Sequence, residues 1–202
     1  NVEAAIRDIS EHAVHGDHVV MVLFGHGSFT DKARINLPGR DLSADDFAEL
    51  VRILPGQQIT FVNTASASGP FIEKLSGDGR VIATATRSGG EQQAAVFGGY
   101  FVEAFSGGQD EADQNKDRRV SMLEAFKYAR LRVEQSYAND GLLAPEHALL
   151  DDNGDGEGTG TPDPLAGDGM LAQSLFFTAG EDRLVTASLL DDPKLVSLYE
   201  EQ

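Results

Sequence analysis

The sequence predicts a single α/β domain of three layers, in which helices flank a mostly parallel sheet. Three short apolar runs, at residues 18–24, 59–63 and 80–86, lack polar alternation, which is typical of strands buried on both faces. Segments with apolar residues at helical spacing separate these runs. Strands that alternate with helices form an open sheet, and such sheets bind ligands at the carboxyl ends of their strands.

Each expected helix has its own signal in the sequence. Apolar side chains recur at helical spacing in residues 2–13, and His15-Gly16 is expected to end this helix. Between the first two strands, Ser43 is expected to cap a helix whose first turn is acidic. Further helices are expected at about 71–75, 94–105 and 121–137, a loop at 151–169, and a last strand or helix at 171–177.

Length and charge limit the domain organisation and the partners. The 202 residues suit one domain, placed at residues 1–190, and residues 191–202 are expected to begin an acidic helix that is cut short. Sixteen basic against 33 acidic residues give a formal charge of −17, which repels phosphate and anionic lipid. Nucleic acid is therefore not expected as a partner. No apolar run is long enough to span a bilayer, so no membrane contact is predicted from this segment.

Residues with reactive side chains follow the first two strands. The first strand runs into Gly25-His26-Gly27 and the second into Thr64-Ala65-Ser66. If these strands are neighbours, about 4.8 Å apart, an imidazole and a hydroxyl face a gap that a substrate carbonyl could enter. The N–H groups of Gly27 and Ser66 would then hold an oxyanion. The sequence is equally compatible with a tight turn at the glycines and with structural capping serines.

These motifs resemble those of the legumain-type branch of the caspase-like cysteine peptidases. VLFGHGSF (22–29), ITFVNTASASG (59–69) and VIATATRSGGEQ (81–92) are similar to strands of that family, of which one ends in His-Gly and the next in Ala-Cys-x-Ser-Gly. The resemblance implies a three-layer caspase/legumain-like fold, here lacking at least one leading strand, and an ancestral hydrolysis of peptide bonds. By this resemblance, His26 matches the catalytic histidine, Gly27 an oxyanion donor, and Ser66 the position of the nucleophilic cysteine.

The serine at position 66 lowers the expected activity. The chain has no cysteine, which excludes a thiol nucleophile, disulfides and thiolate metal sites. A thiol is partly ionised at neutral pH, whereas a serine hydroxyl needs a well-oriented base. We therefore expect little or no peptidase activity, either in a natural pseudoenzyme or in a chain whose cysteine was replaced in the laboratory. The alternatives are a non-catalytic peptide-binding or scaffold module and genuine serine catalysis.

A serine hydrolase of the α/β-hydrolase kind is a further interpretation. The turn around Ser66 lies between a strand and a helix and is built of small residues, like a nucleophile elbow. Ser66 would then act with His147 as base and with Asp113 or Asp117 as the acid. Small residues replace both elbow glycines and the strands are too few, which counts against this interpretation.

An acidic loop at residues 113–124 is a candidate calcium site. It fits the calcium-loop template at positions 1, 3, 5, 9 and 12, where hard oxygen ligands converge on one ion. Position 6 is Arg118, and a side chain there disfavours the required turn. The end of the loop also fits a capping box. The candidate ligands are Asp113, Asn115, Asp117, Ser121 and Glu124.

A second loop begins in the same way and is a weaker candidate for calcium. Asp151, Asn153 and Asp155 precede Gly156 at position 6, but the twelfth position is Pro162, which cannot ligate through a side chain. A full loop of this type is therefore excluded, and a solvated turn competes with cation binding by these three residues.

No cofactor is required by the expected chemistry, and calcium is the one candidate ion. His12, His15 and His18 precede the first strand without acids on the same face, so no metal site is expected there. The calcium-like loops and the strong acidity favour a periplasmic or secreted location.

Overall fold

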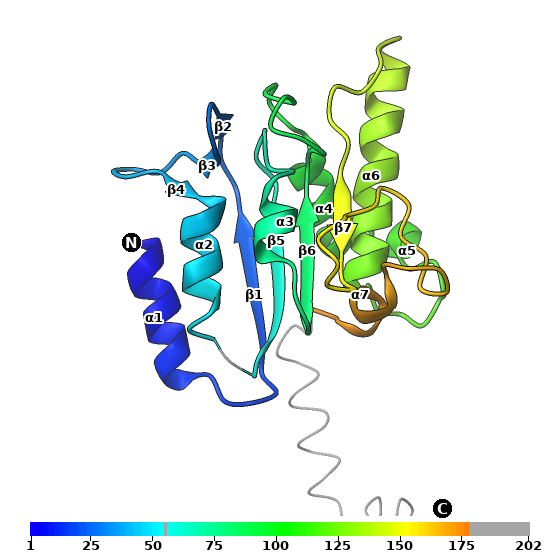
Figure 1. Cartoon of the computed structure of the whole chain (residues 1–202). Coiled ribbons are helices and arrows are strands. Elements are labelled where there is room, and N and C mark those ends of the chain that lie inside the picture. Colours follow the sequence, from blue (N-terminus) through cyan, green and yellow to red (C-terminus); the bar gives the residue numbers. More distant parts are fainter. Residues whose placement is uncertain (55, 178–202) are drawn as a thin grey trace, which may run out of the picture.

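The computed structural model describes residues 1–54 and 56–177, which form three layers around a four-stranded sheet (Figure 1). The strand order is β1-β5-β6-β7, with the first three strands parallel and the last one antiparallel to β6. The predicted α/β class with a mostly parallel sheet is therefore confirmed. The strands are β1 (His18–Leu23), β5 (Gln58–Asn63), β6 (Arg80–Thr84) and β7 (Leu149–Asp151).

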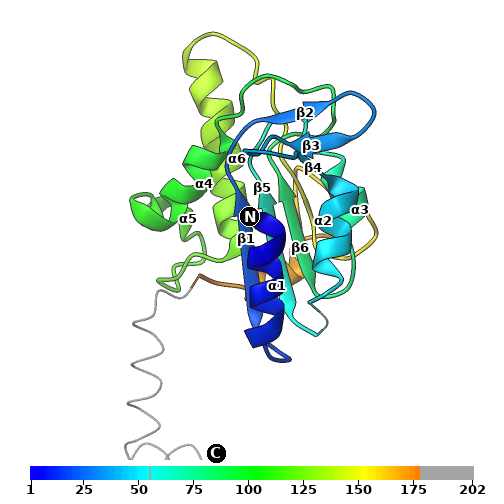
Figure 2. The same cartoon turned by 90° about the vertical axis from the view of Figure 1, so that its left-hand side faces the viewer.

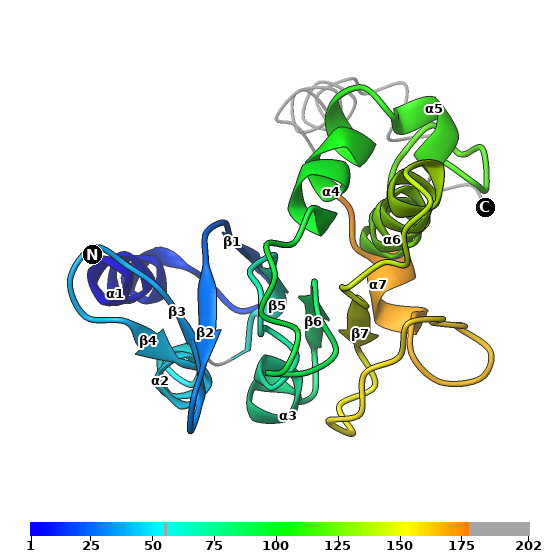
Figure 3. The same ribbon diagram turned by 90° about the horizontal axis from the view of Figure 1, so that it is seen from above.

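Helices cover both faces of the sheet (Figure 3). On one face Phe61 packs between Phe47 and Phe71, with ring centroids 5.3 and 6.1 Å away. On the other face Val62 belongs to a cluster around Phe97 and Phe126. The first face carries α1 (Val2–His12), α2 (Ala44–Val51) and α3 (Phe71–Leu75); the second carries α4 (Phe97–Ser106), α5 (Gln109–Ala112), α6 (Met122–Asn139) and α7 (Met170–Ser174).

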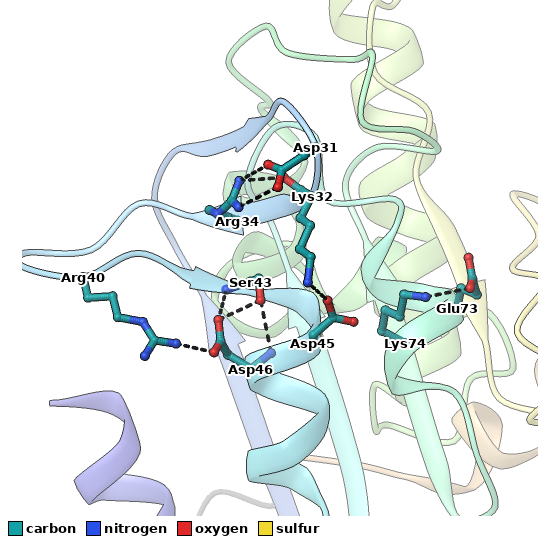
Figure 4. Close-up of polar contacts among 9 residues, drawn as sticks. All are labelled: Asp31, Lys32, Arg34, Arg40, Ser43, Asp45, Asp46, Glu73 and Lys74. Carbon is teal, nitrogen blue, oxygen red and sulfur yellow. Dashed lines mark hydrogen bonds and ion pairs between the residues drawn. The ribbon is translucent and has the colours of Figure 1, made fainter.

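A small antiparallel sheet, which the sequence did not predict, follows β1. It consists of β2 (Gly27–Phe29), β3 (Ala33–Ile35) and β4 (Leu42–Ser43), which are too short to give a clear alternation. Ser43 ends this sheet and caps α2, as predicted. Its hydroxyl accepts the Asp46 N–H at 3.2 Å, and the Asp46 carboxylate accepts the Ser43 N–H at 2.8 Å (Figure 4).

The first strand is less buried than its continuous apolar sequence predicts. Only Val19 is buried, and the other residues of β1 are half-buried. The reason is its position, because in the described part of the chain β1 is an edge strand that pairs with β5 alone (Figure 2). The strand ends at Leu23, and Phe24 is exposed.

Three predicted elements have boundaries that differ in the structure. The first helix ends at His12 instead of at His15-Gly16, because the Asp17 carboxylate accepts the Val14 N–H at 2.9 Å and starts a turn. The helix expected from residue 94 begins at Phe97, where a carboxylate from Glu146 caps it. The stretch 171–177 holds most of α7, followed by a β-bridge at Phe176. Residues 178–190 of the predicted domain and the acidic helix predicted at 191–202 lie outside the described residues.

None of the helices within residues 1–54 and 56–177 combines the length and the apolar character needed to cross a membrane.

Candidate functional site

The segments that carry His26 and Ser66 follow neighbouring strands. β1 and β5 pair in parallel, with Leu23 opposite Asn63. His26 follows Leu23, and Ser66 follows Asn63, at the same distance along the chain. The Gly27 N–H donates to the Ser66 hydroxyl at 3.3 Å, and this hydroxyl donates to the Gly27 carbonyl at 3.1 Å. The two strand ends that the sequence singled out therefore touch at the carboxyl edge of the sheet.

The contact between these segments requires a glycine at position 27. A Cβ atom built there would lie 1.9 Å from the Ser66 carbonyl oxygen, far inside van der Waals contact. Glycine at this position is thus explained by close backbone approach.

Ser66 is 5% exposed, and the backbone of its turn has two unusual features. Within the described residues, no acceptor is found for its N–H group. The next residue, Ala67, has a φ of +55°, an unusual conformation for a residue with a side chain. The Ser66 N–H is accordingly open to an acceptor, whereas the Gly27 N–H is engaged by the Ser66 hydroxyl.

The His26 side chain is exposed, in contrast to Ser66. Its imidazole makes no hydrogen bond with any residue in the described part of the chain. The structure therefore brings Gly27 and Ser66 into contact and leaves the neighbouring imidazole free on the surface.

Ser68 belongs to the support of this turn. Its hydroxyl lies 3.1 Å from the Thr86 hydroxyl and accepts the Thr86 N–H at 3.2 Å, while the Gly69 N–H donates to the Thr86 hydroxyl at 3.2 Å. All three residues are buried, so Ser68 joins the ends of β5 and β6.

Glu91 and His147 form a second acid–histidine pair at the same edge of the sheet. The Glu91 carboxylate lies 2.7 Å from the His147 Nδ1 and 3.0 Å from the Arg87 Nε. Asp113 and Asp117, the acids expected to orient His147, instead bind their own loop. Sequence analysis missed Glu91 because β7 is antiparallel, which returns His147 to the carboxyl end of β6.

A cavity of about 550 Å³ is lined in part by His147 and Arg87, the two partners of the Glu91 carboxylate. Its lining includes Phe97, Val133, Leu143, Arg130 and His147. Next to His147, the buried Glu146 carboxylate accepts N–H bonds from Val96 at 2.8 Å and Phe97 at 3.2 Å, and burial raises the pKa of Glu146.

The loop at 113–124 has the backbone of a calcium loop in spite of its arginine. Arg118, at position 6, takes a φ of +70°, the left-handed conformation that glycine usually provides. The Asp113 carboxylate accepts the N–H groups of Asp117 at 3.2 Å and Arg118 at 2.9 Å. The Glu124 carboxylate accepts the Asn115 N–H at 3.2 Å and also forms the predicted capping box with Ser121. The predicted capping box is therefore confirmed, and calcium binding by this segment stays a prediction.

The loop at 151–156 repeats this arrangement and is closed by a residue that the sequence did not point to. The Asp151 carboxylate accepts the N–H groups of Gly154 at 3.1 Å and Gly156 at 2.9 Å. Asp168, 5% exposed, accepts the N–H groups of Asp152 and Asn153, at the two positions that Glu124 binds in the first loop. Burial raises the pKa of Asp168. No local pattern could have found this acid, because the fold brings it from outside the loop.

Within residues 1–54 and 56–177, no group of three or more His, Asp or Glu side chains converges closely enough to hold a metal ion. In both loops the carboxylates bind backbone N–H groups instead. Two of the three histidines near the start of β1 are engaged by separate partners: His12 bonds the Asp8 carbonyl at 2.7 Å, and the half-buried His18 bonds Thr60 at 2.8 Å. Burial lowers the pKa of His18.

Comparison with known proteins does not assign the chain to a family. No model of a known protein family matches it. No curated protein matches it either. Among solved structures, it is similar to protein GSU0716 from Geobacter sulfurreducens, with 13% identity and a TM-score of 0.49 over 81% of this chain and 74% of that one.

Proposed function

We propose that the chain is a homologue of legumain-type and caspase-like peptidases whose strand-end cleft binds peptides and cleaves them slowly or not at all. The observation that carries this proposal is the paired contact of Gly27 with Ser66 at the carboxyl ends of β1 and β5. The resemblance of three successive strand ends to that family supports the same conclusion.

The roles follow from the geometry of the strand ends. The N–H groups of Gly27 and Ser66 would hold a substrate carbonyl oxygen, which would replace the Ser66 hydroxyl as the acceptor of the Gly27 N–H. His26, exposed beside them, would act as the acid and base. The Ser66 hydroxyl directs its proton to the Gly27 carbonyl, which cannot remove it. A serine without a base in contact is a weak nucleophile, which explains the low activity that we propose.

Ser66→Cys tests this function sharply, because it introduces the first thiol into a chain without cysteine. We expect the variant to cleave members of a mixed peptide library that the parent leaves intact, and His26→Ala in the same background to lower the rate at least about 100-fold. Binding of peptides by both proteins without cleavage by either would support the scaffold function. Absence of both binding and cleavage in both proteins would contradict the proposal.

A serine hydrolase is the second candidate, and the contact of Glu91 with His147 at 2.7 Å favours it. A carboxylate that accepts a hydrogen bond from Nδ1 leaves Nε2 of the imidazole free to act as a base, as in a catalytic triad. In this case the parent itself would cleave, a serine-reactive phosphonate would block it, and His147→Ala would abolish activity while His26→Ala would not. The same library assay therefore separates the two candidates.

We also propose that the loop at 113–124 binds calcium, with Asp113, Asn115, Asp117, Ser121 and Glu124 as ligands. The left-handed backbone at position 6 supports this, because glycine usually provides that conformation for the sharp turn in loops of this type. The loop at 151–156 is the weaker site, in which Asp168 would supply the carboxylate that Pro162 cannot.

Calcium binding is expected to raise the melting temperature. Calcium at 100 times its Kd stabilises a protein by about 2.7 kcal/mol, and each kcal/mol is about 2–4 °C for a chain of this size. Asp113→Ala should remove most of the calcium-induced rise in melting temperature, and Asp151→Ala a smaller part. Sodium chloride at equal ionic strength is the control, because salt also screens the repulsion between surface acids. The absence of a calcium-specific shift in the unaltered chain would contradict the proposal.

A further inference from the structure

We propose that Glu91 is the positioning residue of the turn that carries Ser66. Glu91 lies beyond the end of β6, contacts this turn through its backbone, and is tied through its side chain to the segment that leads into β7. The proposal rests on the proposed function only for the importance of Ser66. The contacts of Glu91 are present whichever ligand the site at Ser66 binds.

The Ser66 turn depends on the loop that contains Glu91. Ala67 adopts a φ of +55°, which is unfavourable by about 1–2 kcal/mol for a residue with a Cβ and persists only where its surroundings hold it. Its N–H donates to the Glu91 carbonyl at 2.8 Å. Gly69 lies so close to this loop that a Cβ would be 2.2 Å from the Arg87 carbonyl carbon. Movement of the loop would therefore release the turn.

The Glu91 carboxylate in turn holds the loop. It accepts the Arg87 N–H at 3.1 Å and pairs with the Arg87 guanidinium at 3.0 Å. From the other side it accepts the His147 N–H at 3.1 Å and contacts the His147 Nδ1 at 2.7 Å. Its side chain is only 12% exposed. Four donors on one shielded carboxylate are charge-assisted contacts, which are stronger than those of a neutral group.

A neutral amide cannot replace this carboxylate. In Glu91→Gln one oxygen becomes an NH₂ group. In place of Oε2 it faces two backbone N–H donors, and in place of Oε1 it faces the Arg87 guanidinium, so at least one of the four contacts is lost and the charge is lost from all of them. The backbone carbonyl at position 91 is retained, but the loop that places it is no longer tied to the segment before β7. The Ser66 turn should then open more often, without a matching change in the rest of the sheet.

Amide hydrogen exchange in otherwise unaltered protein measures this opening directly. We expect Glu91→Gln to speed exchange of the Ala67 N–H at least tenfold, with unchanged exchange in the middle of β5 and in α6. A residue with a merely structural role would shift all slowly exchanging amides together. Glu134→Gln is the matched control, since Glu134 pairs with Arg130 at the same i,i+4 spacing and does not contact the turn.

Variants of His147 test the contact between the His147 side chain and the Glu91 carboxylate. His147→Asn keeps a side-chain N–H in place of Nδ1 and should leave Ala67 exchange within about twofold of the parent. His147→Leu removes that donor and should resemble Glu91→Gln. Equal exchange in the asparagine and leucine variants would overturn the role of this contact.

A second readout uses Ser66→Cys as a reporter. Alkylation of its single thiol by iodoacetamide should be at least threefold faster when Glu91→Gln is added, because residue 66 is 5% exposed in the parent turn. Unchanged Ala67 exchange together with an unchanged alkylation rate would overturn the proposal. Neither measurement needs peptide cleavage, so this proposal and the proposed function can fail separately.

Discussion

At the carboxyl edge of the sheet, the close approach of two backbone segments decides which residues fit at positions 27 and 67. Gly27 admits the Ser66 carbonyl oxygen, and the left-handed Ala67 turns the chain away directly after the serine. The place of residues 26, 27 and 66 directly after two apolar strands could be predicted, because glycines and polar residues after apolar strands are local signals. The hydroxyl's actual partner could not, since it depends on the register of two strands.

Gly27→Ala should disrupt the close backbone approach between the segments that carry Gly27 and Ser66. The added Cβ would lie 1.9 Å from a backbone oxygen that has no rotamer to move to, so we expect a loss of about 1–3 kcal/mol of stability and of peptide binding. Gly99→Ala is the control, because open space surrounds that position and alanine favours its helix. Urea unfolding measures the stability of both variants, and a titration measures their affinity for peptide. Stability and affinity of Gly27→Ala equal to those of the parent would refute the close approach.

At the scale of elements, the helices begin where short-range polar contacts allow them to begin. α2 and α6 both start with a serine whose hydroxyl and a following acid form a capping box, at Ser43 with Asp46 and at Ser121 with Glu124. These starts could be predicted because donor and acceptor lie within one turn. The start of α4 could not, because its cap, Glu146, comes from a distant segment.

Ser43→Ala should lower the free energy of unfolding by about 1 kcal/mol, because it removes the acceptor for the Asp46 N–H and leaves the capping carboxylate with one donor fewer. Ser43→Thr keeps the hydroxyl and is expected to stay within about 0.5 kcal/mol of the parent. The midpoint of urea unfolding, at constant slope, is the measurement. Equal midpoints for the alanine and threonine variants would show that the box adds nothing.

At the scale of the whole molecule, the order of the strands decides which distant groups meet. β7 joins β6 in the antiparallel direction, so the segment before it arrives at the edge where the parallel strands end. This places His147 beside Glu91. The edge position of β1 leaves its apolar side chains half-buried in the described residues, and the predicted leading strand stays a prediction.

The sequence by itself determined the class of the fold, the three apolar strands, the caps of α2 and α6, and the residues that follow the first two strands. Each depends on periodicity or on contacts within a few residues, which a single chain displays directly. Only the tertiary structure decided that Glu91 meets His147, that Asp168 closes the loop at 151–156, and that Ser66 hydrogen-bonds with Gly27. Those contacts join residues far apart in the chain, and their geometry is fixed by strand order and direction, which local patterns do not encode.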